Sequence, residues 1–135
     1  MFLMDTNIWL ELLLDQDKAE EVRRLLEAEE ARQFALTDFS LYSLGVILTR
    51  LKKDEVFLDF LSDTLEDSAV RLIRLDTASL KEVPIVRRKF GLDFDDAYQY
   101  LAAEKYDLTL VSFDSDFDRT ERGRKTPAKA GGLGP

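Results

Sequence analysis

Aspartates at three points of the chain are the residues best suited to chemistry. Asp5 ends a short apolar run at the N-terminus, and Asp114 comes two residues after the apolar segment 108–112. Asp96 lies near the start of the helix expected just before that segment. Ligands of open parallel sheets collect beyond the carboxyl ends of the strands. If both apolar segments are strands of such a sheet, Asp5 and Asp114 share one edge, and a helix that starts there brings Asp96 to it.

Carboxylates that meet in this way need a counter-charge. Close carboxylates repel one another, so each has its pKa raised. A hard divalent cation such as Mg²⁺ or Mn²⁺ relieves the repulsion, because it prefers oxygen ligands. A cation of this kind activates a water molecule and stabilises the charge on a phosphate during transfer. The three aspartates therefore indicate metal-assisted hydrolysis of phosphodiester bonds.

Each aspartate also has a structural interpretation. Asp5 can cap the helix that follows it, Asp96 can complement a helix dipole, and Asp114 can form hydrogen bonds within a turn. A calcium loop of the EF-hand type starting at Asp114 is excluded, because that loop needs glycine at its sixth position and glutamate at its twelfth. The chain has Arg119 and Lys125 at these positions.

Composition narrows the chemistry further. The chain contains no cysteine and no histidine, which excludes disulfides, thiolate nucleophiles, cysteine-bound zinc and histidine-based catalytic triads. Carboxylates are then the strong metal ligands that remain. The net charge of −8 argues against broad, charge-driven binding of nucleic acid. A basic cluster after the acidic turn is a candidate for contacts with RNA phosphates, or alternatively a solvated segment: Arg119, Arg122, Arg124 and Lys125.

Short apolar segments alternate with longer segments of helical composition. The expected strands cover 1–5, 33–37, 70–75 and 108–112. The expected helices cover 8–14, 17–32, 40–53, 54–65, 77–90 and 93–106. Pro84 should kink or divide one of them, and Gly91 should end it. This alternation is typical of an α/β fold with a parallel sheet covered by helices on both faces.

We expect a single domain over 1–125 and a flexible C-terminal tail over 126–135, where the sequence becomes rich in small residues. No apolar run reaches about 18 residues, the length that marks a membrane-spanning helix. The first residues lack the basic start and the long apolar core of a signal peptide. The expected location is therefore the cytoplasm, without contact to a membrane.

Three short motifs carry a resemblance to a known family. They are the opening Phe-Leu-Met-Asp-Thr-Asn at 2–7, Phe-Asp-Asp-Ala at 94–97 before an alanine-rich stretch, and Leu-Val-Ser-Phe-Asp-Ser-Asp-Phe at 110–117. In this order and spacing the chain resembles PIN-domain proteins, in particular the VapC-type toxins of toxin–antitoxin pairs. The resemblance implies a three-layer α/β/α fold with a central parallel sheet of four or five strands, and cleavage of RNA that depends on Mg²⁺ or Mn²⁺.

The resemblance also implies roles for individual residues. Those that match the family's site are Asp5, Asp96 and Asp114 as catalytic metal ligands, Asp116 as a further metal ligand, and Thr6 and Asn7 as supporting residues. The family has a glutamate early in the helix after the second strand, where this chain has Ser43. A hydroxyl is a weaker ligand for Mg²⁺ than a carboxylate, so Ser43 is expected to support the site through a water. Asp38, Asp95 or Asp116 could supply the missing carboxylate.

Two functional hypotheses follow. The first is a Mg²⁺- or Mn²⁺-dependent endoribonuclease, the toxin of a toxin–antitoxin pair, which cleaves RNA with a metal-activated water. The second is a catalytically degenerate PIN-like module that binds RNA or a partner protein without cutting it, which Ser43 favours. RNA, a cognate antitoxin and a second copy of the chain are the expected partners.

Overall fold

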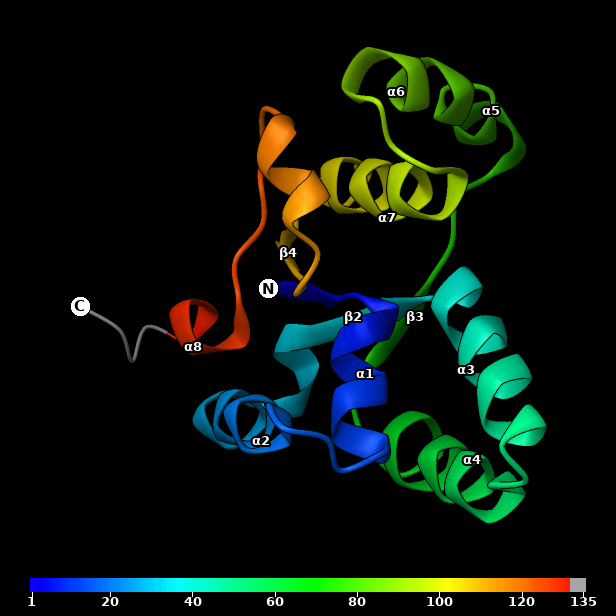
Figure 1. The fold of residues 1–135 in the computed structure, drawn as a ribbon, viewed down its shortest axis with the longest axis vertical. Helices are drawn as coiled ribbons and strands as arrows, with labels where there is room; N and C mark the ends of the chain where they lie inside the picture. Colours follow the sequence, from blue (N-terminus) through cyan, green and yellow to red (C-terminus); the bar gives the residue numbers. More distant parts are fainter. Residues whose placement is uncertain (132–135) are drawn as a thin grey trace.

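A parallel sheet of four strands forms the centre of the protein, which a computed structural model describes over residues 1–131. The strands are β1 (Phe2–Met4), β2 (Phe34–Thr37), β3 (Arg71–Ile73) and β4 (Thr109–Val111). Their order across the sheet is β3-β2-β1-β4 (Figure 1), and all three neighbouring pairs are parallel. The first and last strands of the sequence therefore do not both lie at sheet edges; β1 is internal and pairs directly with β4.

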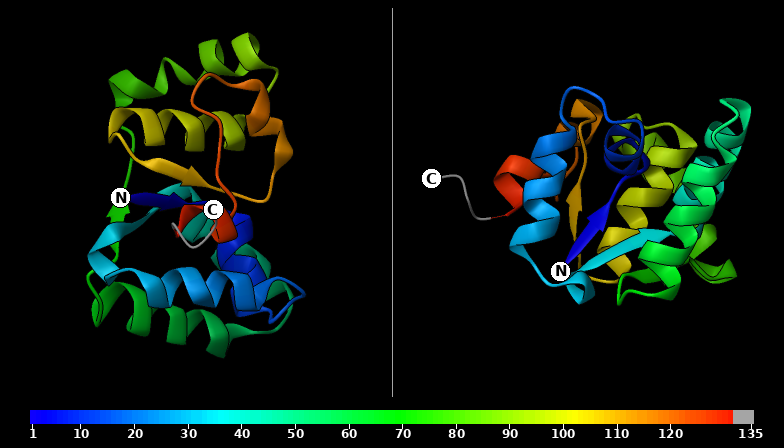
Figure 2. Two further views of the ribbon diagram at one scale, coloured as in Figure 1. Left: turned by 90° about the vertical axis from the view of Figure 1, so that its left-hand side faces the viewer. Right: turned by 90° about the horizontal axis from the view of Figure 1, so that it is seen from below.

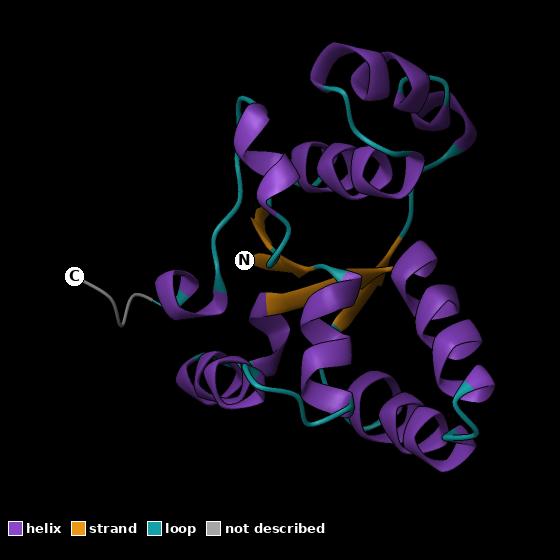
Figure 3. Ribbon diagram, in the orientation of Figure 1, coloured by secondary structure: helices purple, strands orange, loops and turns teal. Residues whose placement is uncertain are grey.

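Helices cover both faces of this sheet. The α-helices are α1 (Thr6–Leu13), α2 (Ala19–Ala28), α3 (Asp38–Arg50), α4 (Asp54–Phe60), α5 (Thr77–Leu80), α6 (Val83–Phe90), α7 (Phe94–Lys105) and α8 (Pro127–Ala130). The short elements η1 (Ala31–Gln33), η2 (Leu61–Glu66) and η3 (Ser115–Arg119) complete the described chain. Figure 2 shows the sheet between a layer of α5, α6 and α7 and a layer that includes α1, α2 and α4, and Figure 3 shows the strands enclosed by helices.

The alternation of side chains along the strands builds a separate core on each face. In β1, Leu3 packs with residues of α7 such as Leu101, whereas Met4 packs on the other face with Ile8 and Leu44. Successive strand residues point to opposite faces, and both faces here are covered, so consecutive residues are apolar. The expected three-layer α/β/α architecture with a parallel sheet is confirmed, with four strands.

Proline and glycine divide the segment 77–90 as their backbone preferences dictate. The segment is divided, as Pro84 led us to expect: α5 and α6 are separate helices, and Pro84 lies in the first turn of α6, where a missing N–H costs no hydrogen bond. Gly91 ends α6 in the left-handed conformation, with φ of 65°, and its N–H bonds to the carbonyl of Arg87. The predicted C-cap is therefore confirmed.

The C-terminal segment is packed where a flexible tail was predicted to begin. Residues 127–130 form α8, with Pro127 and Ala130 buried, and the N–H of Ala128 donates to a carboxylate oxygen of Glu21 at 2.9 Å. This helix lies against α2. Small residues, which suggested flexibility in the sequence, allow this close packing. The last part of the predicted tail, 132–135, lies outside the described residues. Among helices of the described chain, none is long and apolar enough to cross a membrane.

Candidate metal centre

The pairing of β1 with β4 brings the N-terminal aspartate to the segment around residue 112. The N–H of Asp5 donates to the carbonyl of Val111 at 2.9 Å, directly after both strands end. Asp5 then caps α1, since its side chain accepts from the N–H of Thr6 at 2.8 Å. Asp5 thus both caps a helix and lies at the sheet edge, as predicted.

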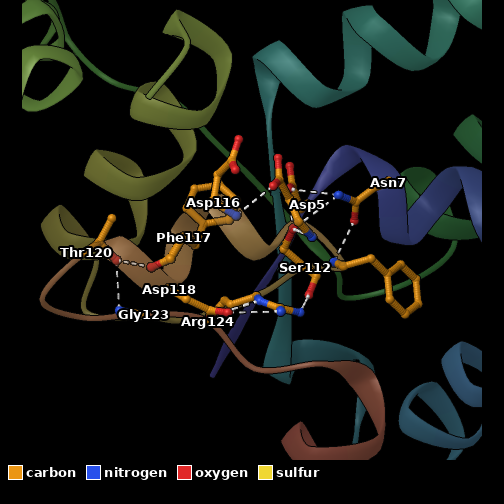
Figure 4. A network of polar contacts seen from close by, with 11 residues as sticks. Asp5, Asn7, Ser112, Asp116, Phe117, Asp118, Thr120, Gly123 and Arg124 are labelled. Carbon is orange, nitrogen blue, oxygen red and sulfur yellow. Dashed lines mark hydrogen bonds and ion pairs between the residues drawn. The ribbon is translucent and has the colours of Figure 1, made fainter. Parts of the chain in front are cut away.

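Four donors surround the Asp5 carboxylate, which is only 5% exposed. Its Oδ1 accepts from the N–H of Thr6 and from Nε2 of Gln99 at 3.1 Å. Its Oδ2 accepts from Oγ of Ser112 at 2.7 Å and from Nδ2 of Asn7 at 3.3 Å, as Figure 4 shows. Burial nevertheless raises the pKa of Asp5, helped by the charge of Asp114, because these hydrogen bonds offset the loss of water only in part.

Three further carboxylates converge beside Asp5. Asp96 lies in the first turn of α7, and Asp114 and Asp116 lie in the loop and short helix after β4. One carboxylate oxygen from each of the three lies within 4.8 Å of the other two. At Mg²⁺–oxygen distances of about 2.1 Å, neighbouring octahedral ligands lie about 3 Å apart and opposite ones about 4.2 Å apart. Side-chain movements that bring the three oxygens closer together would let them hold one ion. The donor set, all carboxylate oxygen, fits a hard divalent cation.

Burial and neighbouring negative charges also disfavour the ionised form of Asp96. Partial burial and the negative charges of Asp114 and Asp5 raise the pKa of Asp96 to about 8. Arg119 places a positive charge beside the cluster, with its Nη1 3.5 Å from Oδ1 of Asp116 at an exposed position. The cluster therefore favours any species that brings positive charge to it.

Hydrogen bonds of Ser112 lock the loop after β4 to the first turn of α1. Its Oγ accepts from the N–H of Asp114 at 3.0 Å and from Nδ2 of Asn7 at 3.1 Å, so its own hydrogen is donated to Asp5. Oδ1 of Asn7 accepts from the N–H of Phe113 at 3.1 Å. The two small polar residues expected to support Asp5, Thr6 and Asn7, both contact it or its partners.

Sequence reasoning missed three polar residues of this network, namely Gln99, Ser40 and Ser112. One signal was available, because Gln99 follows Asp96 by three residues and so shares its face of α7. Ser40 contacts Oγ1 of Thr6 at 2.7 Å. The other two carry no comparable signal, since serine near a helix start or strand end is common for local reasons.

Ser43 lies on α3 one turn after Ser40. It lines an apolar hollow of about 350 Å³ with Phe39, Tyr42, Val46 and Ile47. The polar link from α3 to Asp5 runs through Ser40 instead. Of the carboxylates expected to compensate for Ser43, Asp116 joins the cluster, whereas Asp38 accepts from the hydroxyl of Tyr98 at 2.6 Å, and Asp95 is exposed.

The basic cluster after the acidic turn is bonded mostly to the chain itself. Arg119, Arg122 and Arg124 donate to backbone carbonyls at 2.7 to 3.2 Å. The carbonyls belong to Phe90 and Gly91 for Arg119, to Leu108 for Arg122, and to Ser112 for Arg124. Lys125 is exposed, and its backbone pairs with β4. These arginines hold the last described segment to the fold, and contact with RNA stays a prediction for all four residues.

Comparison with known proteins agrees with this fold. No curated protein matches the chain. A chain of a toxin–antitoxin complex from Klebsiella pneumoniae is 22% identical, with a TM-score of 0.75 over 94% of this chain and 98% of that one. FitAcB from Neisseria gonorrhoeae is 20% identical, with a TM-score of 0.72 over the same shares. VapC20 of Mycobacterium tuberculosis, a sarcin-ricin loop cleaving toxin, is 15% identical, with a TM-score of 0.73 over 87% of this chain and 93% of that one.

These likenesses show the fold, and the family model goes further. The model of the PIN domain matches residues 2–123, which include every strand and all four clustered aspartates. With nearly its whole length matched, the chain belongs to the PIN-domain family.

Proposed function

We propose that this protein is a PIN-type ribonuclease that depends on Mg²⁺ or Mn²⁺ and acts as the toxin of a toxin–antitoxin pair. The observation that carries the proposal is the convergence of Asp96, Asp114 and Asp116 beside buried Asp5. One structural neighbour is a chain of a toxin–antitoxin complex, and another is FitAcB. A third, VapC20, is a toxin that cleaves the sarcin-ricin loop. RNA is the proposed substrate, an antitoxin the proposed partner, and the cytoplasm the proposed location.

The side chains divide the work by their position. The cation would be held by Asp96, Asp114 and Asp116. The buried Asp5 would add a fourth carboxylate beside them. A bound divalent cation would supply an activated water and stabilise charge on the phosphate. Because the pKa of Asp96 is about 8 without a cation, this carboxyl carries a proton at neutral pH and must release it when a cation binds. Binding should therefore strengthen as the pH rises toward 8.

The test is RNA cleavage by purified variants in the presence of Mn²⁺. Asp96→Asn and Asp5→Asn should abolish cleavage and leave the far-ultraviolet circular dichroism spectrum unchanged. Asp107→Asn is the matched control, because it makes the same charge change at a side chain that is 96% exposed and lies two residues beyond the C-terminal end of α7. Cleavage that survives both site changes would refute the proposal.

A second candidate, a PIN-like module that binds without cutting, has its own supporting observation. Ser43 contributes no carboxylate, and each oxygen of Asp5 already accepts two hydrogen bonds. In this case the wild-type chain cleaves no RNA at any Mn²⁺ concentration, and Ser43→Glu strengthens Mn²⁺ binding or creates activity. Cleavage by the wild type that Asp96→Asn removes would exclude this candidate.

A further inference from the structure

A buried amide connects α3 to the Asp5 carboxylate. Gln99 lies on α7 and is 1% exposed. Its Nε2 donates to Oδ1 of Asp5 at 3.1 Å and to Oγ of Ser40 at 2.9 Å, and its Oε1 accepts from Oγ1 of Thr37 at 2.6 Å. The amide thus uses both hydrogens and its oxygen, although no charge lies on Gln99 itself.

The surrounding hydroxyls determine which way this amide faces. Oγ1 of Thr37 accepts from the N–H of Ser40 at 3.0 Å, so its hydrogen is free to be donated to Oε1 of Gln99. A flipped amide would place Oε1 against Oδ1 of Asp5, where two acceptors would repel each other. The NH₂ group of Gln99 must therefore face the carboxylate.

The resulting hydrogen bonds all run in one direction. The N–H of Ser40, in the first turn of α3, donates to Thr37; Thr37 donates to Gln99; and Gln99 donates to Asp5. Hydrogen bonds in such a chain polarise one another, and the helix N-terminus at its origin carries partial positive charge. This series of hydrogen bonds thus stabilises negative charge on Oδ1 of Asp5 without adding a charge of its own.

Gln99 acts on the carboxylate together with Ser112. Ser112 holds Oδ2 of Asp5 at 2.7 Å, and Gln99 holds Oδ1. Because each oxygen has at least one side-chain donor, rotation of the carboxylate about its last torsion breaks at least one of these bonds. The two donors come from different elements, Ser112 from the end of β4 and Gln99 from α7, so both sides of the site determine where Asp5 points.

We propose that Gln99 is a positioning residue of the candidate metal centre, which fixes the Asp5 carboxylate while Thr37 and Ser40 fix Gln99. The inference rests on the proposed function, because a metal centre is what gives the orientation of Asp5 a purpose. A neutral donor suits this place, since the site already holds four carboxylates. An apolar side chain would leave Oδ1 of Asp5 and the hydroxyl of Thr37 without this buried partner.

The first test measures Mn²⁺ binding to the full chain by titration calorimetry. Gln99→Met keeps the length of the side chain and removes its donors and acceptor, so Mn²⁺ affinity should fall about 10- to 100-fold, as when other supporting residues of metal sites are changed. Tyr98→Phe is the matched control at the neighbouring position of α7, because it removes a hydroxyl that donates to Asp38 and accepts from the N–H of Leu75. It should lower stability and leave Mn²⁺ affinity unchanged.

Equal Mn²⁺ affinity of Gln99→Met and the wild type would overturn the inference and leave the proposed function standing. If Gln99→Met does not fold, Ser40→Ala removes one anchor of the amide and should weaken binding in the same direction. A wild-type chain that binds no Mn²⁺ would instead refute the proposed function.

A second measurement needs no metal. Urea unfolding of Gln99→Met, Asp5→Ala and the double variant forms a cycle that reports the coupling between the two side chains. Gln99→Met should change the unfolding constant by a smaller factor when Asp5 is already alanine. Equal factors in both backgrounds would show that Gln99 does not hold Asp5, whatever the outcome with Mn²⁺.

Discussion

The change Asp96→Asn should stabilise the metal-free protein at neutral pH. In the folded state, partial burial and the charges of Asp114 and Asp5 raise the pKa of Asp96 from the ordinary 3.8 to about 8. A raised folded-state pKa means that the folded protein binds this proton more tightly than the unfolded chain does. The stability it contributes is complete below about pH 4 and is lost as the pH rises through about 8.

The expected gain follows from these values. At pH 7 the folded carboxyl remains protonated about 3 pH units above the ordinary pKa, and about 1.4 kcal/mol per unit sets a ceiling of about 4 kcal/mol. Asp114 and Asp116 are half-buried, so solvent screens part of the repulsion. The net gain should be about 1–2 kcal/mol at pH 7 and close to zero near pH 4.

Urea unfolding in the presence of a chelator measures this gain. The fluorescence of Trp9, the single tryptophan of the chain and only 2% exposed, reports the transition. Asp107→Asn serves again as the exposed control and should show no pH-dependent gain. Saturating Mn²⁺ should reverse the order, because the wild type gains binding free energy that Asp96→Asn loses. A gain of equal size at pH 4 and pH 7, or a loss at pH 7, would refute the electrostatic account.

Three further substitutions test the contacts that stabilise the helices around the site. Gly91→Ala should lower the free energy of unfolding by about 1 kcal/mol in urea titrations, because the residue caps α6 with φ of 65°; an unchanged midpoint would contradict this. Ala130→Asp places a charge in a buried position of α8, so limited trypsin digestion should cut the C-terminal segment faster than in the wild type. Arg119→Met removes donors to the carbonyls of Phe90 and Gly91, and thermal unfolding should show a loss of about 0.5–1.5 kcal/mol. A melting temperature equal to that of the wild type would mean that Arg119 does not hold α6.

Local sequence pattern was sufficient to predict the strands of the sheet and three of the clustered aspartates. Asp5 and Asp114 were predictable because apolar segments of strand length precede them, and the ends of parallel strands meet at one edge. Asp96 was predictable because an acidic residue in the first turn of α7 lies where that helix begins. Gly91 and Pro84 set helix ends through backbone preferences that act within one turn.

Contacts between distant segments decided the rest. Gln99 meets Asp5 across 94 residues and Ser112 meets it across 107, and neither residue type by itself indicates such a partner. Whether a side chain reaches the acidic edge depends on the rotation of its helix, so Ser40 contacts the network while Ser43 faces an apolar hollow one turn away. The contacts of the arginines after η3 and the packing of α8 could not be predicted either. An arginine can face solvent or bond to a buried carbonyl, and a small residue can lie in a flexible segment or against a helix. The sequence by itself determined which carboxylates gather at the sheet edge, and the tertiary structure decided which neutral side chains hold them, since hydrogen bonds between distant segments leave no periodicity in the chain.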